Sequence, residues 1–176
     1  MLSQLRPNES IESVRSGRRP TPSPGLRIPL PKIKKQLTQR DKDIFLRDSF
    51  GVVKSYFERA LQDLGDQYQE VQTGFAAVHS FKFVSTIYVR GEVGNRCKIW
   101  LGGFSGSDSI AYQAGQFSID SDNSYNDMLS ISVEENRLGF RTSGMWIGGQ
   151  EYMGDELLSA EQAAEYLWTR FTDNLA

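Results

Sequence analysis

Hydrophobic residues recur at helical spacing in two stretches of the chain. The first begins near Thr38, a residue type that is common at helix N-caps, and Asp41 follows where it suits the positive end of a helix dipole. Gly65 is expected to end this helix, because glycine tolerates the left-handed conformation of the position after a helix. The apolar positions recur at every third or fourth residue and form one stripe along the helix: Leu46, Phe50, Val53, Phe57, Leu61 and Leu64.

The second helical stretch lies near the end of the chain. Ser159 and Gln162 have the spacing of a capping box, with Leu158 before them, and this predicts a helix N-terminus. The expected buried face of this helix comprises Ala163, Ala164, Leu167, Trp168 and Phe171.

Between residues 70 and 148 the period of the pattern changes to two, which is typical of strands. A weaker strand is expected near 71–78. Short connections at 91–95 and 135–136 favour antiparallel neighbours, because a parallel crossover needs a dozen or more residues. The alternating apolar positions are Phe81, Phe83, Ile87, Val89, Cys97, Ile99, Leu101, Ile110, Tyr112, Ala114, Leu129, Ile131, Val133, Leu138 and Phe140.

These elements predict an α+β fold. An antiparallel meander sheet of five or six strands would be flanked in sequence by an N-terminal and a C-terminal amphipathic helix, both packed on one sheet face. The other face would carry Lys82, Tyr88, Arg90, Lys98 and Trp100, and an open aromatic and basic face is a candidate binding surface. The alternative is that a loop or the N-terminal segment covers this face, or that Trp100 is ordinary packing.

Charge divides the chain into two parts. Of 20 Lys and Arg and 22 Asp and Glu residues, eight basic and two acidic ones lie in residues 1–35, and all six prolines lie in the first 31 residues. Such a segment has too few apolar residues to offset its ordering entropy. We therefore expect a disordered or semi-extended tail over 1–36 and a single domain over 37–176.

The tail has two interpretations. It could bind nucleic acid or an anionic surface by releasing counterions. It could instead be a solvated linker, which we favour because no aromatic residue interleaves with the charges for base stacking. The basic residues concerned are Arg15, Arg18, Arg19, Lys32, Lys34 and Lys35.

The composition limits which disulfides, metal sites and membrane segments the chain could contain. One Cys and one His exclude an intramolecular disulfide framework and a His/Cys zinc cluster. No apolar run reaches the roughly 18 residues of a transmembrane helix, and no secretory signal is recognisable, so a cytoplasmic location is expected. Residues 120–127 are rich in oxygen ligands but fail the EF-hand pattern at Tyr125 and Ile131, so a turn-rich loop is favoured over a calcium site. We expect no metal and no cofactor.

Candidate catalytic groups are few. Cys97 and His79 could form a nucleophile and base only if the fold brought them together, and Cys97 is predicted to point inward. A hydrolase using carboxylates or Ser105 would need a pocket that joins the glycine-rich residues 102–108 to residues 144–149. The sequence does not decide between enzyme and non-enzyme, although the second is favoured.

From about Lys34 to Leu175 the chain resembles a bacterial domain found C-terminal to signalling modules such as TIR domains. The stretches that carry the resemblance are Leu37-Thr-Gln-Arg-Asp-Lys-Asp43, Ser55-Tyr-Phe-Glu58, Cys97-Lys-Ile-Trp-Leu-Gly-Gly103 and Ala163-Ala-Glu-Tyr-Leu-Trp168. The resemblance implies an accessory sensing or interaction domain. The leading hypothesis is therefore a non-catalytic binding or sensing domain for a protein or small-molecule partner; nucleic-acid or anionic-surface binding through the tail and a hydrolase are the alternatives.

Overall fold

A computed structural model describes residues 36–103, 106–142, 157–173 and 175. In this part of the chain, two helices and six strands follow in the order α1, β1 to β6, α2. The helices are α1 (Gln39–Gln67) and α2 (Ala160–Thr172). The strands are β1 (Val71–His79), β2 (Lys82–Val89), β3 (Glu92–Gly103), β4 (Gly106–Ala114), β5 (Asp127–Glu134) and β6 (Arg137–Thr142).

The strands form one antiparallel sheet in sequence order, so the predicted meander is confirmed with six strands. Two tight turns join neighbouring strands, and both place consecutive residues at positive φ: Arg90 and Gly91 between β2 and β3, and Glu135 and Asn136 between β5 and β6. Turns of this hand match the twist of antiparallel strands. The first turn is shorter than the predicted loop, since β3 already begins at Glu92.

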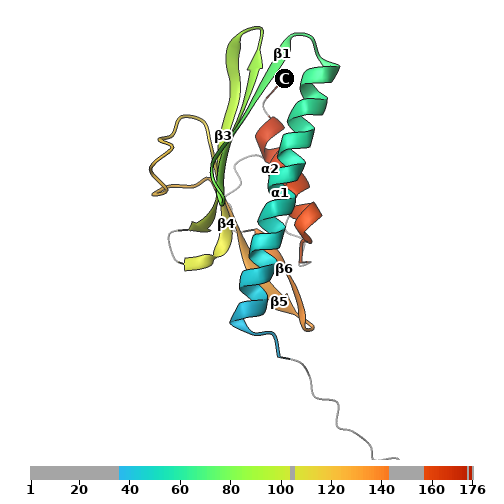
Figure 1. Cartoon of the computed structure of the whole chain (residues 1–176), viewed down its shortest axis with the longest axis vertical. Coiled ribbons are helices and arrows are strands. Elements are labelled where there is room, and N and C mark those ends of the chain that lie inside the picture. The colour runs from blue at the N-terminus through green and yellow to red at the C-terminus, as the bar shows by residue number, and fades with distance from the viewer. Residues whose placement is uncertain (1–35, 104–105, 143–156, 174, 176) are drawn as a thin grey trace, which may run out of the picture. The chain divides into compact units, whose positions relative to one another are not determined.

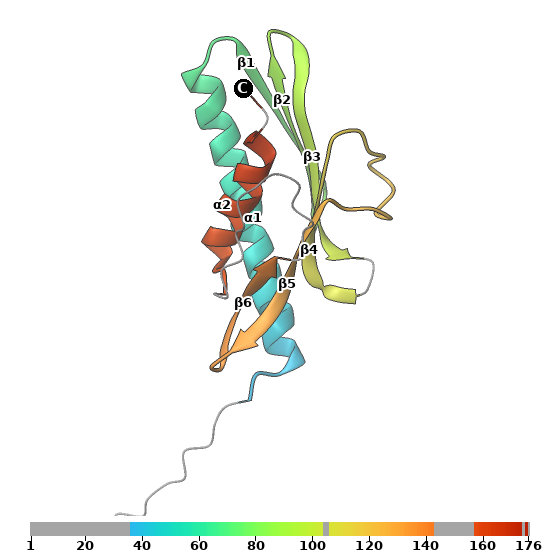
Figure 2. The same cartoon turned by 180° about the vertical axis from the view of Figure 1, so that it is seen from behind.

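Both helices lie on one face of the sheet, and the loop between β4 and β5 lies on the other (Figures 1 and 2). The helix-covered face holds the core, which includes the predicted stripe of α1, from Leu46 to Leu61, and Ala163, Ala164, Leu167 and Phe171 of α2. Sheet residues Phe83, Ile99 and Tyr112 meet them from below and are almost fully buried. This confirms the predicted α+β fold.

Each helix begins with a capping box. Thr38 Oγ1 accepts a hydrogen bond from Asp41 N, and Thr38 N donates to the Asp41 carboxylate. Ser159 and Gln162 make the reciprocal pair at α2. These bonds satisfy backbone groups that the first turn of a helix leaves unpaired.

The predicted end of the first helix at Gly65 is wrong. The helix continues to Gln67, and Tyr68 caps it in an extended conformation with its N–H bonded to Leu64 O at 3.2 Å. Gly65 lies where the helix passes close to β1, because a Cβ at this position would be 3.5 Å from Thr73 Oγ1. A Cβ at this distance would make an ordinary van der Waals contact, so Gly65 neither ends the helix nor is required by the packing against β1.

No helix in the described residues is long and apolar enough to cross a membrane.

Candidate functional site

The face of the sheet opposite the helices is covered over β2, β3 and β4 by residues 115–126, the β4–β5 loop (Figure 2). Beneath the loop, the Lys98 side chain is fully buried and Trp100 is 3% exposed. The expectation that these two residues lie on an open face is therefore wrong, and the alternative of a covering loop is what the structure shows. Their assignment as binding residues stays a prediction.

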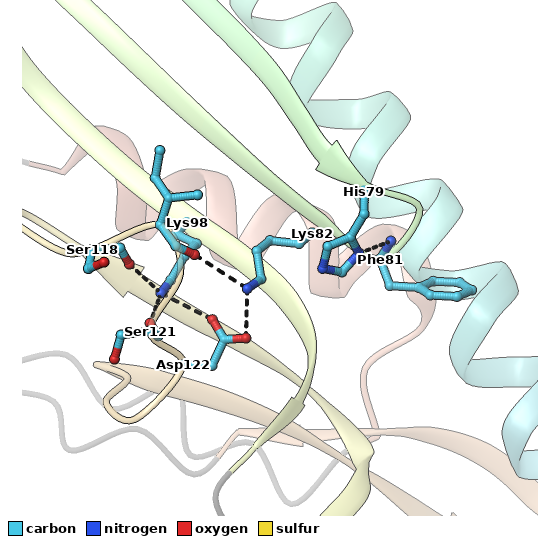
Figure 3. Close-up of polar contacts among 8 residues, drawn as sticks. His79, Phe81, Lys82, Lys98, Ser118, Ser121 and Asp122 are labelled. Carbon is cyan, nitrogen blue, oxygen red and sulfur yellow. Dashed lines mark hydrogen bonds and ion pairs between the residues drawn. The ribbon is translucent and has the colours of Figure 1, made fainter.

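Lys98 holds the loop from below. Its ammonium group donates to the backbone oxygen of Ser118 at 3.1 Å and to that of Ser121, and it lies 3.2 Å from Asp122 Oδ1 (Figure 3). Burying an ammonium group is costly unless its donors are satisfied. These three contacts all come from the loop, so the loop supplies the partners that allow Lys98 to be buried.

Lys82 provides a second cation at the same carboxylate. Lys82 Nζ lies 2.7 Å from Asp122 Oδ2 and donates to the backbone oxygen of Ile119 at 3.4 Å, so Asp122 bridges two lysines (Figure 3). Partial burial alone would raise the pKa of Asp122, but hydrogen bonds and charge from Lys82 and Lys98 outweigh it and lower that pKa below its ordinary value of 3.8. Asp122 is therefore ionised at neutral pH. We call Lys82, Lys98 and Asp122 the lysine clamp.

Aromatic rings complete the environment of the clamp. Lys98 Nζ lies 4.6 Å from the ring centre of Trp100 and 5.4 Å from that of Phe117, which belongs to the loop. The guanidinium group of Arg96 also lies over the Phe117 ring, 4.8 Å from its centre. Cation–π contacts gain strength when the cation is desolvated, as Lys98 is.

Backbone and amide hydrogen bonds fix the two ends of the loop. Gly115 N donates to Arg96 O at 2.9 Å, and Asn126 N donates to Tyr112 O at 2.8 Å. The Asn126 side chain accepts from Ala114 N at 2.6 Å. The loop is thus held at both ends and at its middle, while Ile119 and Tyr125, each 38% exposed, are its exposed large hydrophobic residues.

The other two predicted face residues lie outside this cover. Tyr88 is half-buried on β2 near Gly74 of β1, and Arg90 is in the β2–β3 turn. The Arg90 side chain is highly exposed and pairs with Glu70 at 3.0 Å, a surface contact of little energetic weight. The structure therefore does not bring Tyr88 and Arg90 into the clamp. The six tail residues Arg15, Arg18, Arg19, Lys32, Lys34 and Lys35 lie outside the described residues.

Two carboxylates of residues 120–127, the segment considered as a calcium site, lie on opposite faces of the sheet. Asp122 joins the clamp, whereas Asp127 is fully buried on the helix-covered face. Asp127 accepts a hydrogen bond from Tyr166 Oη and lies 3.5 Å from Arg170 Nε, so it ties α2 to the start of β5. Over the described ranges, no group of three or more His, Cys, Asp or Glu residues could hold a metal ion.

Cys97 and His79 lie in different environments, one in the core and one at the surface. Cys97 lies in the core beside Ser85, and burial raises the pKa of its thiol far above the ordinary range. His79 is exposed at the end of β1, and its Nδ1 accepts a hydrogen bond from Phe81 N at 3.2 Å, as Figure 3 shows. A buried protonated thiol is a poor nucleophile. Ser105 and residues 144–149 of the hydrolase hypothesis lie outside the described residues.

Sequence analysis missed the clamp, although one signal for it was present. Val84, Trp100 and Ala111 point to the same face as the two lysines and are buried. Apolar residues at the outward positions of three adjacent strands indicate a covered face. The sequence gives no comparable indication of the contacts of Asp127 with Tyr166 and Arg170, because these two residues lie about 40 positions after Asp127.

Comparison with known proteins gives one family. Residues 72–173 match the model of the Y4lF protein domain, a range that contains β2 to β6 and the lysine clamp. The chain is 32% identical over 137 residues to "Uncharacterized protein y4lF" of Sinorhizobium fredii, an alignment that covers 78% of this chain and 41% of that protein. The chain thus spans about two fifths of the length of this curated relative. No solved structure matches. The match over more than half of the chain, together with this relative, shows that the chain belongs to the Y4lF domain family.

Proposed function

We propose that this protein is a non-catalytic interaction domain that recognises a partner through the β4–β5 loop. The observation that carries the proposal is the lysine clamp. It fixes a twelve-residue loop, residues 115–126, on a rigid sheet and leaves Ile119 and Tyr125 exposed. A loop held in one conformation loses little entropy when it binds, which favours recognition.

Lys98 and Trp100 act in this proposal as positioning residues beneath the loop rather than as contact residues. Arg90 and the half-buried Tyr88 would extend the surface along β2. Asp122, Asp127 and Cys97 support a binding role, because Asp122 is paired with two lysines and Asp127 and Cys97 are buried in the fold.

The relative supports a modular role. More than half of the Sinorhizobium fredii protein lies outside the aligned part, so the domain occurs there beside other sequence. We propose that the domain acts as an accessory to such a neighbouring module, and a signalling module such as a TIR domain is the candidate that the resemblance implies. The cytoplasmic location stays a prediction.

Site-specific photo-crosslinking in the cells that make the protein tests the loop. A photoreactive amino acid at position 119 should give a discrete adduct, whereas the same group at Val133, an exposed position on β5, should give none. The Asp122→Asn variant should lose the adduct at position 119, because it removes the carboxylate that both lysines bind and the middle of the loop is no longer held. An adduct that survives Asp122→Asn, or one that forms equally at both positions, would contradict the proposal.

A further inference from the structure

In the described residues, the edge of the sheet at β1 lacks the charges and prolines that normally protect an exposed edge strand, and its one irregularity is the register shift between Ala77 and His79. Residues 71–79 contain no Lys, Arg, Asp, Glu or Pro. Natural edge strands are usually protected by such residues, by cover or by short length, because their free backbone groups pair with other chains. The opposite edge differs, since Phe140 of β6 exchanges two backbone hydrogen bonds with Leu158.

The register shows which backbone groups of β1 face outward. Arg90 N donates to Glu70 O at 2.9 Å, so Glu70 and Arg90 form a hydrogen-bonded pair just before Val71 meets Val89. Hydrogen-bonded and non-hydrogen-bonded pairs alternate along an antiparallel ladder. Gln72, Gly74 and Ala76 therefore bond to β2. The N–H and C=O groups that point away from the sheet belong to Thr73, Phe75 and Ala77.

The regular part of this edge is complementary to itself. It runs from Val71 to Ala77, where the register shifts, so its centre is Gly74. A second copy related by a twofold axis at Gly74 would place Thr73 opposite Phe75 and Val71 opposite Ala77. Thr73 and Phe75 direct their N–H and C=O groups outward, so both strands offer donors and acceptors in register at this pair. Val71 N already donates to Tyr68 O at 3.0 Å, so the Val71–Ala77 pair would gain only the bond from Ala77 N to Val71 O. The strand carries no charge that could repel its own copy.

Two residues of β1, Gly74 and Phe75, fit this arrangement. Gly74 would face its copy across a non-hydrogen-bonded pair, where Cα atoms approach to about 4.5 Å. The fold of a single chain does not require glycine here, since a Cβ would meet only Thr86 and Tyr88 at 3.9 Å. Phe75 is half-buried and stacks on Phe83 with ring centres 5.1 Å apart, and Thr73 of a second copy would cover its exposed part.

We propose that the protein forms a homodimer by antiparallel pairing of β1 with β1 of a second copy. The two sheets join into one continuous sheet. This surface is separate from the β4–β5 loop, so the dimer and the proposed recognition function stand or fall independently.

Sedimentation velocity of the full chain over a range of concentrations, with residue-resolved amide hydrogen exchange, tests the dimer. A monomer–dimer equilibrium is expected, and the amides of Thr73, Phe75 and Ala77 should exchange slowly at high concentration and fast on dilution. Those of Gln72 and Gly74 should be protected at both concentrations. A monomer at every concentration, or protection of Thr73 and Phe75 that dilution does not remove, would overturn the proposal, the latter because the chain would cover its own edge.

Two variants locate the interface. Thr73→Pro removes an outward N–H and leaves an unpaired carbonyl at each of two symmetric places, so dimerisation should weaken at least about tenfold. Ala77→Lys introduces the charge that edge strands normally carry and should also favour the monomer. Val133→Lys, at an exposed position of β5, is the matched control and should dimerise normally. Unchanged dimerisation of both β1 variants would refute pairing through β1, whereas loss of dimer with the melting temperature of dilute, monomeric wild type would establish it. Crosslinking at position 119 in Ala77→Lys shows separately whether the loop still binds.

Discussion

The lysine clamp predicts an asymmetry between removal of its anion and removal of one of its cations. Asp122→Asn leaves the ammonium groups of Lys82 and Lys98, which are 8% and 0% exposed, without a counter-charge. Lys98→Met leaves the 2.7 Å pair of Lys82 and Asp122 intact and fills the space beside Trp100 with an apolar chain of similar length. Removing the carboxylate should therefore be far more destabilising.

The expected magnitudes follow from burial. Breaking a buried ion pair by removing one partner costs about 3–5 kcal/mol. Asp122 itself is 39% exposed, so water can partly solvate the lysines, and we expect about 2–3 kcal/mol for Asp122→Asn. Lys98→Met loses two hydrogen bonds to the backbone oxygens of Ser118 and Ser121. Both are exposed residues of a loop, so we expect their carbonyls to turn toward water and the cost to stay at about 1 kcal/mol.

Urea denaturation followed by far-UV circular dichroism measures both variants, with the change in midpoint at constant slope giving the free energy difference. Asp120→Asn, an exposed carboxylate of the same loop, is the matched control and should leave stability unchanged. Limited proteolysis of the loop reports a loss that is confined to the loop. If Lys98→Met proves as destabilised as Asp122→Asn in both measurements, the account of the clamp as two cations sharing one anion is refuted.

Four further outcomes are expected. Because Lys82 and Lys98 lower the pKa of Asp122, the clamp stabilises the fold fully above pH 3.8 and less as pH falls below it, so the melting temperatures of wild type and Asp122→Asn should converge in acid. Cys97, whose thiol pKa is raised by burial, should resist thiol alkylation in the native state and react on unfolding. Tyr166→Phe removes a donor from the buried Asp127 and should cost about 1–3 kcal/mol in denaturation experiments, whereas Tyr125→Phe in the exposed loop should cost nothing measurable. Deletion of residues 1–36 should leave the melting temperature unchanged, because the capping box of α1 begins at Thr38; loss of nucleic-acid affinity on this deletion would favour the tail hypothesis.

Elements were predictable from sequence where their signals are local. The stripe from Leu46 to Leu61 and the Ser159–Gln162 box need only helical periodicity and cap chemistry, and both helices form as expected. Alternation similarly located the strands, and short turns gave their antiparallel order. The end of α1 was mispredicted because glycine is only a weak stop signal: the helix continues through Gly65 to Gln67, and the extended Tyr68 ends it.

The clamp could not be predicted from alternation, although the outward Val84, Trp100 and Ala111 indicate that the face is covered, and the reason is physical. Alternation assigns side chains to two faces but does not say which faces are wet. Lys82 and Lys98 look like solvent-facing residues, and they are buried only because carbonyl oxygens and one carboxylate some 20 to 40 positions later replace their water. The composition of residues 120–127 predicted a turn-rich loop, yet not the direction in which it folds.

The two unusual surfaces of this domain are the outer face under the β4–β5 loop and the edge at β1. They differ in whether their hydrogen-bonding groups have partners, and hydropathy alone does not distinguish them. On the outer face, charged residues are buried because the β4–β5 loop supplies a partner for every donor of Lys98. At β1, uncharged residues lie at an edge where Thr73 and Phe75 have backbone groups directed away from the sheet. Outward backbone groups on an uncharged strand favour pairing with another chain, whereas a buried charge without a partner would oppose folding. The same accounting of donors and acceptors therefore supports both proposals, recognition through the loop and pairing through β1, on different parts of the sheet.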